Sequence, residues 1–151
     1  MKVIKAPNKI VKHDTSIFLA GSIEMGSAEN WQQSIEKLFK NDEGVIYNPR
    51  RDDWDSSWEQ KYTNKQFREQ VEWELEGMET ATTVAMYFDG KTKSPITLLE
   101  LGLHANDGKL IVYCPQSFWR QGNVEVVCRK YDIPLFDSKK EWVSKLKETV
   151  L

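Results

Sequence analysis

One carboxylate, Glu100, stands in the otherwise apolar stretch SPITLLELGLH at residues 94–104. A partly buried carboxylate has a raised pKa unless hydrogen bonds stabilise its charge. It can also act as a nucleophile, for example on the anomeric carbon of a sugar, and form a covalent ester. The alternative is a buried glutamate satisfied by hydroxyl and backbone groups. Helical spacing predicts one shared face for five residues: Ile96, Thr97, Glu100, Leu101 and His104.

Two of these neighbours are polar. Thr97 is a candidate substrate contact, and His104 is interpreted as a packing or hydrogen-bonding residue. We expect the surrounding leucines to hold this segment in the core and so to keep the carboxylate of Glu100 still.

A second group of candidate residues is rich in arginine and tryptophan and lies in NPRRDDWDSSW, residues 48–58. Arg50 and Arg51 can hold a carboxylate or phosphate by bidentate contacts, and Trp54 can stack on a planar base. The alternative is a solvated loop whose charges pair with one another at little gain in stability.

Two further segments carry weaker signals. In GSIEMGS, Gly21 and Gly26 allow a sharp turn before a helix that Ser27 could cap, although a plain strand-to-helix turn explains the same residues. In EQVEWELEGME the acidic residues are expected to face solvent, with Trp73 and Glu74 as the exceptions.

The elements that must position these residues alternate along the chain. Apolar runs predict strands at 16–21, 44–49, 83–88, 109–114 and 133–136. Helical patterns lie at 27–40, 64–81, 95–107, 122–131 and 137–150. The second of these helices has one apolar stripe, formed by Phe67, Val71, Leu75 and Met78.

The central strands are apolar on both faces, which is typical of a parallel sheet covered by helices on each side. We therefore predict an α/β fold: a three-layer flavodoxin/Rossmann-like domain with a five-stranded, mostly parallel sheet. Residues 1–151 are expected to form a single domain, with residues 1–15 as an N-terminal extension. Ligands of such sheets bind beyond the carboxyl ends of the strands, which selects the loops 21–27, 48–60, 89–95 and 115–123.

Composition narrows the class of protein. The chain has 151 residues, and its hydrophobic content of 40% and charged content of 29% fit a soluble globular protein. A net charge of -2 gives no basic field for a nucleic acid polymer. No segment approaches the roughly 20 apolar residues of a membrane span, so no membrane partner is expected. Cys114 and Cys128 are interpreted as core residues, and we predict a cytoplasmic protein with no metal site and no cofactor.

At this point the sequence resembles a known family. IFLAGSIEMG and SPITLLELGLHANDGKLIVY, together with NPRRDDW and GNVEVVC, are similar to the nucleoside 2-deoxyribosyltransferase family and the related 2′-deoxynucleoside 5′-monophosphate N-glycosidases. The resemblance covers about residues 16–136. It implies cleavage or transfer at the N-glycosidic bond of a small-molecule nucleoside or nucleotide, and a homo-oligomer in which a neighbour completes the pocket. Trp119, Arg120 and Asn123 are candidates for that contribution.

The resemblance also implies roles for single residues. Glu100 matches the glutamate that attacks C1′ of the deoxyribose. Gly21 and Ser22 match the loop beside the sugar and its 5′ substituent. Ser94 matches a position that is an aspartate in typical transferases and a serine in the hydrolase branch.

Two positions depart from the family pattern. Thr82 follows Ala81 where an aspartate is expected, and Phe18 replaces a tyrosine. Asp89 is our candidate for the missing acid, with Glu74 and Asp53 as weaker ones. A non-catalytic nucleotide-binding or sensing module on the same fold is the alternative to an enzyme.

Overall fold

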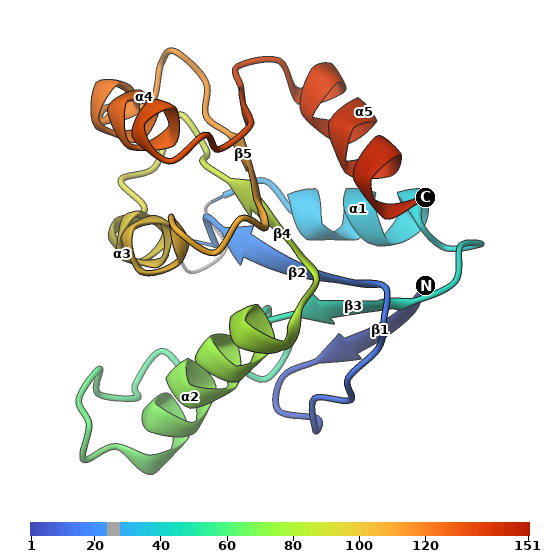
Figure 1. Ribbon diagram of the computed structural model, residues 1–151. Coiled ribbons are helices and arrows are strands. Elements are labelled where there is room, and N and C mark those ends of the chain that lie inside the picture. The colour runs from blue at the N-terminus through green and yellow to red at the C-terminus, as the bar shows by residue number, and fades with distance from the viewer. Residues whose placement is uncertain (24–27) are drawn as a thin grey trace.

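A computed structural model describes residues 1–23 and 28–151 and has a six-stranded sheet at its centre (Figure 1). Every strand pair is parallel, and the strands lie in the order β1-β3-β2-β4-β5-β6. Their bounds are β1 Lys2–Lys5, β2 Ser16–Gly21, β3 Val45–Asn48, β4 Thr83–Tyr87, β5 Leu110–Tyr113 and β6 Leu135–Phe136. The predicted fold class is confirmed, but the predicted count of five strands is wrong.

The additional strand comes from the segment expected to be an N-terminal extension. Its residues pair with β3 in parallel register, starting with Lys2 opposite Val45. The sequence KVIK is short and bounded by lysines, so it lacks the continuous apolar run that marks the central strands. Lysine is common on edge strands because its charge blocks pairing with another chain.

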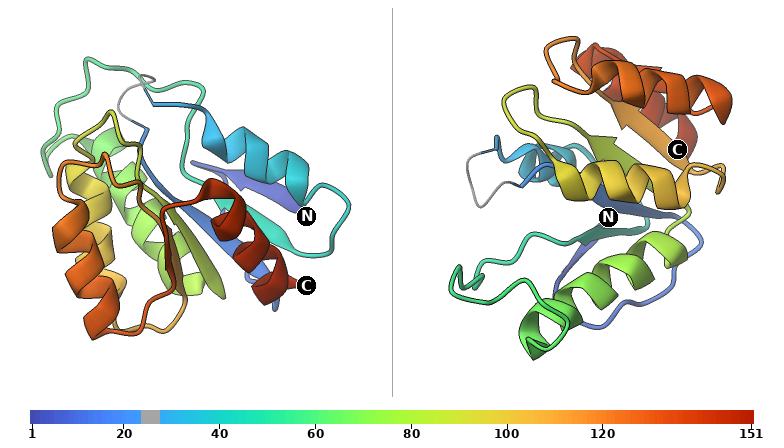
Figure 2. Two further views of the ribbon diagram at one scale, coloured as in Figure 1. Left: turned by 90° about the horizontal axis from the view of Figure 1, so that it is seen from above. Right: turned by 90° about the vertical axis from the view of Figure 1, so that its left-hand side faces the viewer.

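Helices cover both faces of the sheet (Figure 2). Their bounds are α1 Trp31–Leu38, α2 Lys65–Thr80, α3 Pro95–His104, α4 Gln121–Lys130 and α5 Lys139–Val150. Side chains of α1 and α5 pack with one set of strand residues, while those of α2, α3 and α4 pack with the other. The strands alternate accordingly, because Ile17 and Leu19 face α1 and α5 whereas Phe18 and Ala20 face α2 to α4.

Side-chain caps fix where three of these helices begin. Asn30, Asn64 and Ser138 each accept a hydrogen bond from the backbone three residues on, at 3.3, 3.0 and 3.4 Å. The expected cap Ser27 and the glycine at 26 lie outside the described residues.

The faces of two helices differ from the predicted ones. On α2, Val71 and Leu75 are 36% and 37% exposed, while Gln70 and Trp73 are buried with Met78. The reason is Gly77, since a Cβ there would lie 2.6 Å from the ring of Phe18, so this face approaches the sheet closely. The predicted stripe is therefore wrong in part.

On α3 the buried residues are Thr97, Glu100, Leu101 and His104. Ile96, which we expected on the same face, is 58% exposed, and so is Leu99, while Leu103 is 56% exposed. Three apolar side chains of this helix therefore face outward, contrary to prediction. The other four residues of the predicted face are buried together, but the leucines and isoleucine on the remaining sides gave no signal that they would face outward.

Candidate active site

A buried glutamate, Glu100, and a partly buried one, Glu74, lie on neighbouring helices and form the centre of the site. Glu100 of α3 is 8% exposed, and burial raises its pKa from 4.5 to about 8, with a further rise from the negative charge of Glu74 on α2. Burial likewise raises the pKa of Glu74 to about 7. The two groups are therefore close enough to interact, and ionising both at once is unfavourable.

The two carboxyl groups differ in their contacts. The side-chain amide of Gln70 donates to Glu74 Oε1 at 2.8 Å and to the carbonyl oxygen of Pro49 at 2.9 Å. This amide joins α2 to the loop after β3 and opposes the effect of burial on the pKa of Glu74. No described residue donates a hydrogen bond to the carboxyl group of Glu100. Glu100 is consequently a buried carboxyl group to which no described residue donates a hydrogen bond or offers a positive charge.

Glu74 opens onto a cavity of about 430 Å³ at the carboxyl edge of the sheet. This volume lies within the range of small-molecule sites. The lining residues are Ile23, Pro49, Arg50, Arg51, Asp52, Trp54, Ser56, Gln60, Gln70 and Glu74. Glu100 is not among them, and its link to this cavity is its electrostatic interaction with Glu74.

Aromatic and ionic contacts order one wall of the cavity. Arg51 donates to both carboxylate oxygens of Asp53, at 3.0 and 3.1 Å, and its guanidinium carbon lies 5.1 Å from the ring centre of Trp58. The rings of Trp54 and Trp58 meet edge to face with 5.0 Å between their centres. The predicted loop of arginine and tryptophan is therefore a wall of the cavity and not only a solvated turn. Arg50 contacts the side chain of Gln32 at 3.5 Å.

Three buried hydroxyl groups meet at the start of α3. Thr92 Oγ1 lies 3.1 Å from Ser22 Oγ and 2.7 Å from Ser94 Oγ, and the two serine hydroxyls also touch each other. Ser94 has a left-handed backbone with φ of 46°. Gly21 lets β2 approach β4 here, because a Cβ would lie 2.3 Å from the carbonyl oxygen of Tyr87.

Comparisons with known proteins identify the family of this chain. A family model described as "Nucleoside 2-deoxyribosyltransferase like" matches residues 14–118. The chain belongs to this family. A comparison with curated proteins found no significant match.

The match to this deoxyribosyltransferase-like family includes both glutamates, the hydroxyl cluster and the cavity wall, and it ends before α4. Asn123 of α4 lies outside it. That residue lines a different cavity, of about 310 Å³ between α3 and α4, together with Trp119 and Arg120.

Asp89, our first candidate for the acid, is held by the backbone. Its Oδ1 accepts from the N–H of Lys91 at 2.9 Å, and its Oδ2 accepts from the N–H of Glu29 at 3.3 Å. Both carboxylate oxygens are thus used in ordering turns. Asp53, a weaker candidate, is paired with Arg51 and its pKa is lowered.

Two more residues named in the sequence analysis have structural roles away from the cavity. Trp73 is buried, donates from its indole to the carbonyl oxygen of Asn8 at 2.7 Å, and packs near Phe18, so it does not line the cavity. Thr82 exchanges hydrogen bonds with Ser16 at the amino end of β4, the end opposite the cavity. The residue at position 82 is therefore too far along the strand to take part in the site, and an aspartate missing there does not remove an acid from it.

Sequence reasoning missed Gln70 and Thr92, both buried polar residues of the site. A usable signal existed for Gln70, since it precedes Glu74 by four residues and shares its helix face.

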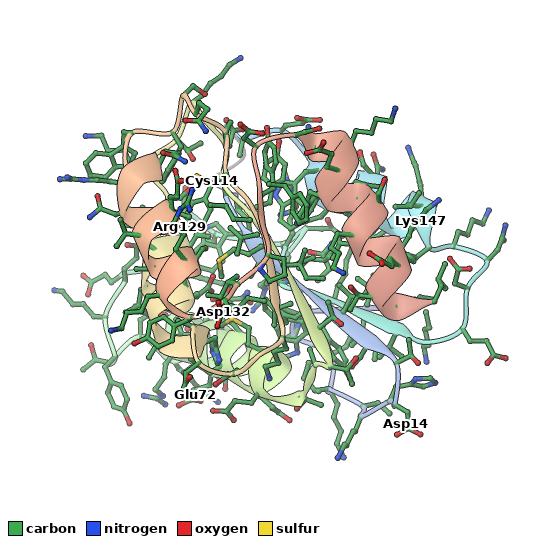
Figure 3. The ribbon with its side chains drawn as sticks, turned by 45° about the horizontal axis from the view of Figure 1, so that its top comes forward. Asp14, Glu72, Cys114, Arg129, Asp132 and Lys147 are labelled. Carbon is green, nitrogen blue, oxygen red and sulfur yellow. The ribbon has the colours of Figure 1, made fainter. Side chains whose placement is uncertain are left out.

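A larger cavity lies away from the glutamates, beside α4 and β6. It measures about 630 Å³ and is lined in part by Cys128 and by Cys114, Arg129 and Asp132, the last three of which are labelled in Figure 3. Burial raises the pKa of both thiols to about 12, so neither is a nucleophile at neutral pH, and Arg129 is paired with Glu125 at 2.7 Å. We therefore place the candidate site at the smaller cavity.

Within residues 1–23 and 28–151, no group of three or more acidic, histidine or cysteine side chains is placed to hold a metal ion. None of the described helices is long and apolar enough to cross a membrane.

Proposed function

We propose that this protein cleaves or transfers at the N-glycosidic bond of deoxynucleosides or deoxynucleotides. Glu100 is the nucleophile, and a covalent deoxyribosyl ester is the intermediate. The observation that carries the proposal is the interacting pair of Glu100, which is buried, and Glu74, which lines a cavity large enough for a nucleoside. Family membership supports the same class of reaction.

The chemistry follows retaining glycosyl transfer. A carboxylate oxygen of Glu100 forms a bond to C1′ while the bond from C1′ to the base nitrogen breaks, and the bonding electrons leave with the base. Protonation of the departing base by an acid makes this step easier. In the second step water or another base attacks C1′ and gives its proton to the group that acted as the acid. The bond between C1′ and Glu100 breaks, and the carboxylate of Glu100 is released.

We assign the acid to Glu74 in preference to Asp89. Glu74 interacts with Glu100 and lines the cavity, whereas both oxygens of Asp89 accept backbone hydrogen bonds. The active form then has one proton on the glutamate pair, as two interacting carboxyl groups favour. This predicts a bell-shaped dependence of kcat/KM on pH.

The remaining contacts have proposed roles in binding. Ser22, Ser94 and Gly21 surround the sugar and its 5′ substituent, with Thr97 next to Glu100 on the same buried face of α3. Trp54 stacks on the base, and the two arginines of the cavity wall hold polar groups of the substrate.

A panel of deoxynucleosides and their monophosphates tests the proposal. The protein is incubated with each compound, with and without a free acceptor base, and the products are separated by chromatography. Exchanged base indicates a transferase, and free sugar indicates a hydrolase. Tight nucleotide binding without any released base would instead support a non-catalytic binding module.

We also propose a homo-oligomer, assembled through the outward side chains of α3. Ile96, Leu99 and Leu103 form an apolar surface without any charge between them. A helix that is apolar all round is normally covered. Light scattering of the purified protein tests this, since a second copy would double the molar mass and a monomer would contradict it. The buried free thiols fit the reducing cytoplasm that we propose as the location.

A further inference from the structure

Ser22, the first residue after β2, is held through both its backbone and its side chain. Its N–H donates to the carbonyl oxygen of Tyr87 at 3.0 Å, and its hydroxyl oxygen accepts from the backbone N–H of Asp89 at 3.0 Å. The remaining group, the carbonyl oxygen of Ser22, accepts from the indole N–H of Trp31 at 3.1 Å. Ser22 is buried, so water does not compete well for these bonds.

Trp31 reaches this position from the other side of the sheet. It is the first residue of α1, and its ring packs between α1, α5 and the sheet, on the face opposite α2 and α3 (Figure 2). The ring is stacked on that of Tyr87, with 4.9 Å between the centres and 13° between the planes. A Cβ on Gly21 would lie 3.0 Å from Trp31 Cζ2, so the indole also lies close against the last residue of β2. These contacts hold the indole in one orientation.

The carbonyl group of Ser22 depends on this one donor, because no other described residue donates to it. A peptide unit is planar, so anchoring the carbonyl oxygen of Ser22 also fixes the orientation of the N–H of Ile23. Ile23 lines the cavity of the candidate site, whereas Trp31 does not. One buried hydrogen bond therefore orients the chain where it passes from the end of β2 into the cavity wall.

We propose that Trp31 is a positioning residue of the candidate site, acting through its indole N–H on the peptide unit between Ser22 and Ile23. For its effect on turnover, the proposal rests on the proposed function. Without this N–H, the carbonyl oxygen of Ser22 is left buried without a partner, which is unfavourable. The peptide unit then gains by turning toward water or another donor, and this movement displaces both Ile23 and the hydroxyl group of Ser22.

Trp142 provides the contrast, because it packs in the same cluster of side chains as Trp31. Its ring centre lies 6.0 Å from that of Trp31, and both residues are buried. The indole N–H of Trp142 donates to the carbonyl oxygen of Ile111, within β5, at 3.0 Å. Ile111 does not line the cavity. The two tryptophans thus share their packing and differ in what their N–H groups hold, so a packing role alone predicts the same outcome for both.

An isosteric replacement separates the N–H from the ring. Benzothienylalanine, which carries sulfur in place of the indole N–H, is incorporated in place of Trp31 or, as the control, in place of Trp142. For a deoxynucleoside that the protein turns over, we expect the replacement of Trp31 to raise KM about fivefold. The value of kcat should change little, because Ser22 is assigned to the sugar and its 5′ substituent and not to C1′. The control should keep both wild-type values. A raised KM in both variants, or in neither, would overturn the inference.

Hydrogen exchange separates this inference from the proposed function, because it needs no substrate. The amides of Ser22 and Asp89 are followed by NMR. Both should exchange at least about fivefold faster in the Trp31 variant than in the wild-type protein or in the Trp142 variant. If no compound releases base but these amides still exchange faster, the proposed reaction is wrong and the role of Trp31 stands. Unchanged exchange at both amides would overturn that role, whatever the substrates show.

Discussion

Helices α3 and α5 are built on opposite plans. Helix α5 buries Trp142 and Leu146 and presents lysine, glutamate and serine to solvent. Helix α3 buries Glu100 and His104 and presents leucine and isoleucine outward. Both pack on the same sheet, one on each face (Figure 1).

The difference lies in how well each helix satisfies its buried side chains. Trp142 donates to the carbonyl oxygen of Ile111 at 3.0 Å and packs at an angle against Trp31, Tyr87 and Tyr113. Both the indole N–H and the rings of Trp142 therefore have partners. On α3, a buried carboxyl group lacks a hydrogen bond, and His104 Nε2 is buried with no partner among the described residues. Buried polar groups that lack hydrogen bonds are expected at sites where function has been favoured over stability.

The largest effect should come from removing the charge of Glu100. Glu100→Gln keeps the shape of the side chain but cannot form the ester, so kcat for base release should fall by about 10³-fold or more. Chromatography of released base measures this loss. Glu141→Gln changes an exposed glutamate on α5 and serves as the control, with activity unchanged. Comparable losses in the two variants would remove the distinction between the helices.

For the free energy of unfolding, we expect the larger effect on α5 and the smaller one on α3. Trp142→Ala empties a fully buried site and should lower the free energy of unfolding by about 3–5 kcal/mol. Leu99→Ala removes an exposed side chain and should cost less than about 0.5 kcal/mol in dilute protein. Urea denaturation measures both values. If Leu99→Ala lowered the free energy of unfolding as much as Trp142→Ala, Leu99 would be a core residue and α3 would not present its apolar side chains outward.

The dependence of stability on pH should report the buried carboxyl group. The pKa of Glu100 is raised from 4.5 to about 8, so its contribution is complete below pH 4.5 and is lost as the pH rises through 8. Glu100→Gln removes the titrating group and should be more stable than wild type at pH 9 by roughly 2–4 kcal/mol, with little difference at pH 4. Urea denaturation across this range measures the difference, and parallel curves for the two proteins would contradict it.

The smallest effect on folding should come from a charge on the outer surface of α3. Leu99→Lys should leave the free energy of unfolding of the dilute protein within about 0.5 kcal/mol and yet dissociate the oligomer. Ser144→Lys adds the same charge to the exposed side of α5 and should leave the oligomer intact. Light scattering distinguishes the two, and an oligomer that persists in Leu99→Lys would place the interface elsewhere.

The fold was largely predictable because its signals are local. The runs VAMYF and LIVYC are apolar throughout, which is typical of a strand covered on both faces, and proline, asparagine and serine mark helix starts. The first strand was not predicted as part of the sheet, because its pairing with β3 depends on residues more than 40 positions away. The outward face of α3 was not predictable either, since the polar side chains of this helix lie on its buried face and apolar ones point outward.

The site was predictable only where a residue conflicts with its surroundings. Glu100 stood out as a charge in an apolar run. Glu74 was only a weaker candidate, because it lies among other acidic residues of a helix whose remaining glutamates face solvent. Asp89 was favoured for its place after a strand, and the sequence does not show that two backbone N–H groups occupy its oxygens. Contacts of this kind exist only in three dimensions.

The most direct test of the account is to trap the intermediate on Glu100. The protein is mixed with a deoxynucleoside that it turns over, quenched in acid within the first turnover, digested and examined by mass spectrometry. The account predicts one added deoxyribosyl group on the peptide that contains Glu100, and none in Glu100→Gln. Base release at full rate with the added group on a different residue, or at full rate in Glu100→Gln, would contradict it.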